Sequence, residues 1–179
     1  VLTSNKYISI FPKASNGGTK LFRKGILCYE DNKPALYSYN SPEFQINESR
    51  VLCATYSAKV SIAKGWKILN DEYLIKCLID GLKGGNAGTY EHELPFNTYE
   101  EFSLSWHNVC KDLKFVPAEA LMFCKESQLQ GRVILPKSLL IPLYRQFEDL
   151  DVLGLSKKSG EAEYVIEEEP SLILTDKII

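Results

Sequence analysis

The sequence predicts an α/β fold made of two repeats, each a small parallel sheet flanked by helices. The first observation is a strand–helix–strand–helix order between Arg50 and Ile79, whose short connections imply parallel pairing and a right-handed crossover. The second observation is a new strand and helix from Gly131 onward. The chain stops at Ile179 before any closing strand and helix, so we expect the second repeat to be incomplete.

The length of 179 residues suits two small domains. We expect a first repeat over residues 1–95, an inter-repeat linker with a helix over 96–130, and a truncated second repeat over 131–179. The linker helix, expected from Tyr99 to Leu113, has an apolar stripe of the kind that packs in a core or between domains. The members of this stripe are Phe102, Trp106, Val109 and Leu113.

The first repeat divides into an N-terminal and a C-terminal part. In the N-terminal part we expect a strand end over 1–4 with further residues upstream, a turn at 16–18, one strand or two short ones over 21–29, and a loop over 32–47. In the C-terminal part we expect strands over 50–54 and 66–69, and helices over 55–64 and 71–79. Thr55 and Asn70 would cap these helices, and Gly65 would end the first of them.

The second repeat begins with a strand over 132–135. A helix from Leu139 to Leu153 would follow, with Pro142 in its first turn, where proline is tolerated. Two strands, over 164–166 and 172–174, would enclose an acidic run at Glu167–Glu169, which we interpret as a solvated charge cluster.

The composition excludes several classes of function. A net charge of -2 and a pI of about 5.8 argue against a nucleic-acid binder with a broad basic face, but allow a small basic pocket for one phosphate. The five cysteines are odd in number and form no Cys-x-x-Cys pair, so we expect neither a disulfide framework nor a zinc site. No apolar run approaches the roughly 20 residues of a membrane span. We expect a cytosolic or nuclear protein without a cofactor or metal.

Catalytic motifs are missing from the sequence. The two histidines, His92 and His107, lie near no nucleophile motif, and no phosphate-binding loop or zinc-protease motif occurs. We therefore expect a protein that is not an enzyme. An enzyme of an unrelated α/β class is the competing hypothesis, and it would require a deep pocket with perturbed titratable groups.

One segment carries a family resemblance. The stretch Ala63–Leu78 resembles the C-terminal half of a BRCT domain: a small residue before Gly65, an apolar strand, a polar cap and a helix with a large aromatic in its first turn. That aromatic is Tyr73, where the family usually has tryptophan. The Asn16–Thr19 stretch resembles the family's Gly-Gly turn between the first helix and second strand.

The resemblance is closest to one group within the family. With Tyr90 and the Leu94-Pro95 pair, residues 63–95 are similar to the first BRCT domain of the DNA-damage checkpoint mediators, the fungal adaptors and their animal counterpart. The segment Gly131–Leu153 resembles the first strand and helix of a second BRCT repeat, and the likeness covers about half of the chain well.

The resemblance implies a function. It implies a nuclear, phosphopeptide-binding scaffold on chromatin, in DNA-damage checkpoint signalling, DNA repair and cell-cycle control. The partner would be a phosphoserine tail of a histone or of another checkpoint protein. The alternative is a phosphate-independent interaction or dimerisation module, because BRCT repeats also pair with each other, as in a homodimer, or with unmodified partners.

The resemblance also implies a phosphate site. Ser4 would donate its hydroxyl, the backbone N–H of Asn5 would add a second bond, and a lysine near the start of the second helix would supply charge. Counting back from Gly65, the family's lysine position falls on Ser57, and Lys59 lies two residues later. Either Lys59 supplies the cation or the site has lost it, and the loss would favour the phosphate-independent alternative. A phosphate needs such convergent donors and a cation.

Three further residues complete the predicted site. Thr55 would cap the helix and touch the phosphate, since helix N-termini attract anions. Arg50 and Arg132 are candidates for a second anion on the ligand, such as a C-terminal carboxylate. The prediction requires the side chains of Ser4 and Lys59 to lie close together.

Overall fold

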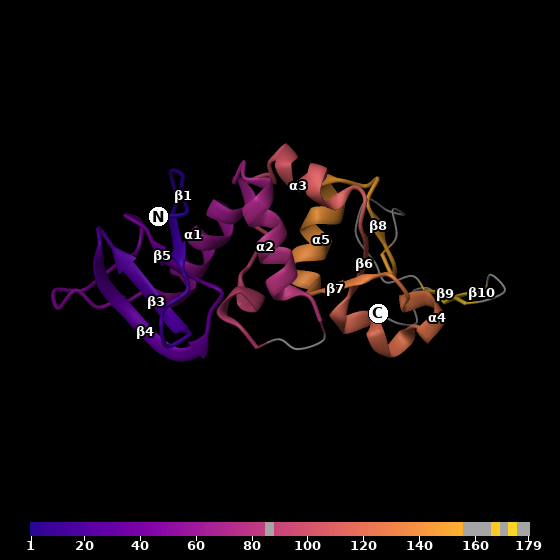
Figure 1. Cartoon of the computed structure of the whole chain (residues 1–179), viewed down its shortest axis with the longest axis horizontal. Coiled ribbons are helices and arrows are strands. Elements are labelled where there is room, and N and C mark those ends of the chain that lie inside the picture. The colour runs from indigo at the N-terminus through magenta and orange to yellow at the C-terminus, as the bar shows by residue number, and fades with distance from the viewer. Residues whose placement is uncertain (85–87, 156–165, 169–171, 175–179) are drawn as a thin grey trace. The chain divides into compact units, whose positions relative to one another are not determined.

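The computed structural model describes residues 1–84, 88–155, 166–168 and 172–174 (Figure 1). Its chain forms two compact α/β units. The first unit is Val1–Asn70 with Ala87–Ser103, and the second is Asp71–Asn86 with Leu104–Ile179. The segment 71–86, which we assigned to the first repeat from the sequence, therefore groups with the second unit, as does most of the expected linker.

The first unit contains a five-stranded mixed sheet with the strand order β1-β2-β5-β3-β4. Neighbouring strands are antiparallel except β3 and β5, which are parallel. Its elements are β1 (Thr3–Ser4), β2 (Ser9–Pro12), β3 (Gly18–Arg23), β4 (Ile26–Pro34), β5 (Tyr37–Asn40), α1 (Thr55–Lys67) and the short 3-10 helix η1 (Tyr90–Glu93).

The parallel sheet predicted for the first repeat is wrong, because two expected strands do not form. Residues 50–54 contain only an isolated bridge between Ile46 and Leu52. Residues 66–69 are the end of α1 and the residues after it. The loop predicted over 32–47 is also wrong in part, because β4 continues through Pro34 and β5 follows within that range.

Gly65 does not end α1, which continues to Lys67. The glycine instead allows the helix to pack closely against Ile8. A Cβ added at Gly65 would lie 2.3 Å from Cγ1 of Ile8, a core residue that follows the β1–β2 turn. The helix passes Gly65 and buries Trp66, whose Nε1 donates to the hydroxyl of Tyr39 at 3.0 Å. Glycine at this position lets α1 approach the β1–β2 turn.

The substitution Gly65→Ala is expected to destabilise the first unit. The added methyl group overlaps Ile8, and overpacking of this kind typically costs about 1–3 kcal/mol. Urea denaturation followed by circular dichroism measures the change. Gly88→Ala is the matched control, because nothing lies within 4 Å of its added Cβ. Equal stabilities of the two variants would contradict the packing role.

The prediction of a turn at 16–18 and of strands within 21–29 is confirmed. Gly17 has a φ of 73°, and β3 and β4 form a hairpin over the later range. The hairpin turn consists of Lys24 and Gly25, with φ values of 52° and 80°. Positive φ at both central residues is the pattern of a two-residue type I′ hairpin turn, which matches the strand twist. The turn fixes where Arg23 and Lys24 lie.

The second unit contains a parallel three-stranded sheet with the order β7-β6-β8. Figure 1 shows α5 beside this sheet. The elements are α2 (Glu72–Leu82), α3 (Leu104–Cys110), β6 (Lys114–Pro117), the 3-10 helix η2 (Ala118–Phe123), α4 (Glu126–Leu129), β7 (Val133–Leu135), α5 (Lys137–Gln146) and β8 (Asp151–Val152). The parallel pairing predicted for the strand after Gly131 is thus confirmed, although its partner is β6.

Several predicted boundaries in the second unit shift. Asp71, not Asn70, caps α2, and its side chain accepts a hydrogen bond from the backbone N–H of Leu74 at 3.1 Å. Helix α5 is shorter than predicted and has Pro142 in its interior. The antiparallel strands β9 (Ile166–Glu168) and β10 (Leu172–Leu174) are close to the last two predicted strands, of which residues 164 and 165 lie outside the described residues.

The apolar stripe predicted from the linker is confirmed as buried for three of its members. Its helical part is α3, which is shorter than the range expected from the sequence. The buried members are Phe102, Trp106 and Val109. Leu113 is half-buried after the end of the helix. The burial of these three side chains agrees with the prediction that the stripe packs in a core or between domains.

Candidate functional site

Ser4 is the last residue of β1, and Asn5 follows it in the β1–β2 turn. The hydroxyl groups of Ser4 and Ser9 are 2.9 Å apart and share a hydrogen bond. The backbone N–H of Asn5 donates to the carbonyl of Ile8, and its side-chain amide donates to the carbonyl of Gly65 in the last turn of α1. Asn5 therefore ties the turn to the C-terminal end of α1, and its N–H is not directed at a ligand.

Thr55, Ser57 and Lys59 lie at the other end of the same helix. Lys59 and Gly65 are six residues apart, which corresponds to roughly 9 Å along a helix axis. The ammonium of Lys59 pairs with the carboxylate of Glu93 at 3.0 Å. The structure brings Thr55 and Lys59 together in one pocket, which Ser57 does not line, and it does not bring them to Ser4 and Asn5.

Arg132 is occupied within the second unit. Its Nε donates to the carbonyl of Gln128, and its Nη1 donates to the carbonyl of Phe115 and to the carboxylate of Asp151. These bonds link β6, β7 and β8. Arg132 thus ties the parallel sheet together, and its predicted contact with a second anion stays a prediction.

Arg50 lines a pocket that also contains two other cations. We call this cavity, of about 240 Å³, the basic pocket. Its lining residues are Arg23, Lys24, Ile26, Cys28, Ile46 and Arg50. Three of these described residues carry a positive charge and none carries a carboxylate, so the pocket is suited to an anion.

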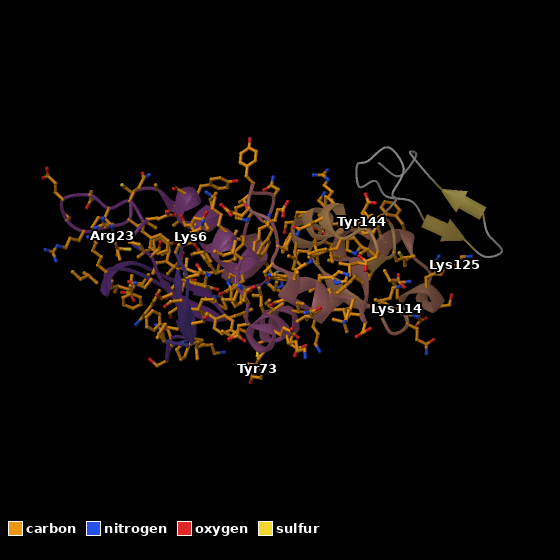
Figure 2. The ribbon with its side chains drawn as sticks, turned by 90° about the horizontal axis from the view of Figure 1, so that it is seen from above. Lys6, Arg23, Tyr73, Lys114, Lys125 and Tyr144 are labelled. Atoms are coloured by element: carbon orange, nitrogen blue, oxygen red, sulfur yellow. The ribbon has the colours of Figure 1, made fainter. Side chains whose placement is uncertain are left out.

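Arg23 is the innermost of the three cations. Its Nε is buried, and among the described residues it is the only buried side-chain nitrogen or oxygen without a hydrogen-bond partner. Figure 2 labels Arg23 in the indigo-to-purple part of the chain. A buried, unpaired polar atom costs about 1–3 kcal/mol, and more when the group is charged. Such an atom in a protein requires an explanation, and a bound anion supplies one.

Lys24 and Arg50 both have left-handed backbone conformations. Their φ values are 52° and 62°, and they are the only non-glycine residues in the described part of the chain with positive φ. In Arg50 the conformation belongs to a tight turn, in which Asn47 accepts hydrogen bonds from the backbone N–H groups of Ser49, Arg50 and Val51. Conformations of this kind cost energy and are over-represented at ligand sites.

Cys28 is a buried residue that lines the basic pocket. Burial raises its pKa, and the nearby guanidinium of Arg23 opposes that rise in part. The thiol is therefore neutral at physiological pH and adds no negative charge to the pocket. The Cys28 thiol therefore does not offset the positive charge of the three cations that line the basic pocket.

A second pocket, of about 260 Å³, lies on the same face of the sheet. We call it the lysine pocket, and it is lined by Leu21, Tyr29, Asp31, Lys33, Leu52, Thr55, Lys59, Tyr90 and Glu93. Glu93 bridges both lysines, with distances of 2.9 Å to Lys33 and 3.0 Å to Lys59, and these two cations lower the pKa of its carboxyl. Two of the residues predicted for phosphate binding, Thr55 and Lys59, are here.

Comparisons with known proteins give no relative: no family model, curated protein or solved structure matches the chain. Within the described residues, no cluster of three or more His, Cys, Asp or Glu side chains is placed to hold a metal ion. None of the described helices has the length and apolar character to cross a membrane. The BRCT resemblance stays a prediction.

Sequence reasoning included Arg50 but missed Arg23 and Lys24. The signal was present, because two cations stand directly before Gly25, in a hairpin turn where asparagine or aspartate is usual. The link between this turn and Arg50 was not predictable from the local pattern, since 27 residues separate Arg23 from Arg50 along the chain.

Proposed function

We propose that this chain is a non-enzymatic, BRCT-like adaptor that binds a phosphorylated segment of another protein, with the phosphate in the basic pocket. A phosphoserine tail of a nuclear checkpoint or chromatin protein is the partner class that the sequence resemblance implies. The proposal keeps the phosphate ligand predicted from the sequence and moves its binding site from Ser4 to Arg23, Lys24 and Arg50.

The buried Nε of Arg23 is the observation that carries this proposal. A phosphate bears about -1.5 to -2 charges and three strong acceptor oxygens. Two guanidinium groups and one ammonium offer more donors than one carboxylate can use. A phosphate at the Arg23 guanidinium would be held by charge-assisted bonds, which are roughly twice as strong as neutral ones, and a rotation of the side chain would bring the buried Nε to it.

The test compares degenerate phosphoserine peptides with the same peptides lacking phosphate, by fluorescence polarisation. We expect the wild-type protein to prefer the phosphorylated pool, and Arg23→Gln to lower that affinity about 10- to 100-fold. Arg50→Asn is expected to act in the same direction while keeping the left-handed backbone that asparagine tolerates. Inorganic phosphate should compete at high concentration.

Arg145→Gln is the matched control, because it removes the same charge from an exposed position on α5. It should leave peptide binding unchanged. Thermal melts establish that each variant is folded. Equal binding of the two peptide pools by the wild type would reject the phosphate site, and tighter binding of a DNA or RNA oligonucleotide would replace the protein partner by a nucleic acid.

A second candidate function is phosphate-independent protein binding. It is favoured by the ion pair of Lys59 with Glu93, which neutralises the cation predicted for the phosphate at the start of α1. This candidate expects binding of unphosphorylated partners, or self-association, that is insensitive to Arg23→Gln. The peptide comparison therefore decides between the two.

A further inference from the structure

We propose that the partner carries a second anionic side chain, two residues from the phosphorylated one, which binds between Lys33 and Lys59 in the lysine pocket. The inference rests on the proposed function, because it names a second feature of the same ligand. The ligand class is an extended peptide with a phosphorylated residue and an acidic or second phosphorylated residue on alternate positions.

The two lysines have hydrogen-bonding capacity beyond their ion pairs. An ammonium has three N–H donors. The described hydrogen bonds of the two ammonium groups are one each to Glu93, and Lys59 Nζ also lies 5.6 Å from the ring centre of Tyr90. The lysine pocket holds two carboxylates, those of Glu93 and Asp31, beside its two lysines, so it gains a net positive charge when Glu93 turns away.

Glu93 is placed as a replaceable partner. Its side chain is 45% exposed, so it can turn toward solvent without creating a buried charge. An anionic side chain of the partner would then take its place between the two ammonium groups. The carboxylate of Asp31 opposes this binding, but it already accepts bonds from the Tyr29 hydroxyl and from the backbone N–H of Lys33.

The start of α1 adds to the preference for an anion. Thr55, the first residue of this 13-residue helix, lines the lysine pocket. The N-cap residue, Ala54, has no side-chain capping bond, and the first turn has no acidic residue. Unpaired N–H groups and the helix dipole therefore favour negative charge at this end.

The spacing of the two pockets matches an extended chain. Leu21 lines the lysine pocket and Arg23 lines the basic pocket, and these are alternate residues of β3 on one face. On the neighbouring strand β4 the pairing register shifts between the two pockets, so β3 is the strand that gives the regular spacing. Alternate residues of a strand are about 6.5–7 Å apart, so an extended ligand with the same repeat reaches both pockets.

The experiment uses alanine-based peptides with one phosphoserine and with glutamate, alanine or lysine at the second residue on either side. On one of the two sides we expect the glutamate peptide to bind the full chain about 2- to 5-fold more tightly than the alanine peptide. The lysine peptide should bind more weakly than the alanine peptide. Isothermal titration calorimetry at low salt measures all three, because such contacts are screened by ions.

Two variants locate the effect. Lys59→Gln should abolish the preference for glutamate and leave the alanine peptide unchanged, whereas Glu93→Gln should increase the preference. Equal affinities of the glutamate and alanine peptides overturn the second-anion inference while the phosphate site stands. Failure of every phosphopeptide to bind overturns the proposed function and, with it, this inference.

Discussion

Glu91→Ala is expected to lower the free energy of unfolding of the first unit by roughly 3–5 kcal/mol. Glu91 is fully buried in η1, and its carboxylate accepts hydrogen bonds from the backbone N–H groups of Leu36 and Tyr37, at 2.9 and 3.2 Å. The hydroxyl of Tyr39 donates to the same carboxylate at 2.7 Å. The substitution leaves one buried and two part-buried donors without an acceptor.

The bonds of Glu91 also explain why a carboxylate is tolerated at this depth. Burial raises the pKa of Glu91, while the three donors act in the opposite direction. The Tyr39 hydroxyl accepts in turn from Trp66 Nε1 at 3.0 Å, so the network joins β5, α1 and η1. Because η1 also carries Tyr90 and Glu93, loss of Glu91 should disturb the lysine pocket as well.

A graded series checks this prediction by urea denaturation. Tyr39→Phe removes one donor and should cost about 1 kcal/mol. The loss of unfolding free energy in Glu91→Gln should lie between those of Tyr39→Phe and Glu91→Ala, because the glutamine amide places an N–H group against a backbone donor. Glu30→Ala, at an exposed position of β4, is the control and should change stability by less than about 0.5 kcal/mol. A small effect of Glu91→Ala would mean that the network contributes little.

Local signals in the sequence predicted local structure well. The turn at Asn16–Gly18 and the buried face of the α3 stripe formed as expected, because each depends on neighbouring residues along the chain. Gly65 was misinterpreted because its role depends on Ile8, which is distant in sequence. An alternation of tyrosine with polar residues from Tyr37 to Asn40 was a strand signal, and we gave more weight to the prolines on either side.

The candidate site was predictable only in part, for the same reason. Three of the residues predicted for the site, Arg50, Thr55 and Lys59, do line pockets of the first unit. The predicted grouping of Ser4 with Lys59 is wrong. The β1–β2 turn packs against the C-terminal end of α1, whereas Lys59 lies nearer its N-terminal end. Such groupings depend on tertiary packing, which a single sequence does not specify residue by residue.

Lys67 is expected to make the stability of the first unit depend on pH in the alkaline range. Burial lowers the pKa of Lys67 from 10.5 to about 8, although Glu100 and Glu101 oppose the shift. Lys67 is 3% exposed as a whole residue, and its ammonium donates to the backbone carbonyls of Phe96 and Thr98 at 2.8 and 3.1 Å. The folded protein thus holds a lysine that loses its proton more readily than in the unfolded chain.

The direction of the effect follows from proton counting. Below about pH 8 Lys67 is charged in both states, and the cost of burying the charge is fully present. Between pH 8 and 10.5 the unfolded chain binds more protons at this residue than the folded protein, so its contribution to stability rises with pH. The whole rise is roughly 3 kcal/mol for a shift of this size.

Other groups act in the opposite direction at high pH, so a variant must isolate this contribution. Burial raises the pKa of Cys110 to about 12, and Glu100 raises that of Tyr7 to about 12, so their contributions fall as the pH rises above 9 to 10. Lys67→Met removes only the lysine. We expect the stability of the wild type relative to Lys67→Met to rise between pH 7.5 and 10, by urea denaturation at each pH. A constant difference across that range would show that the pKa of Lys67 is the same in the folded protein and the unfolded chain, which contradicts the lowered value.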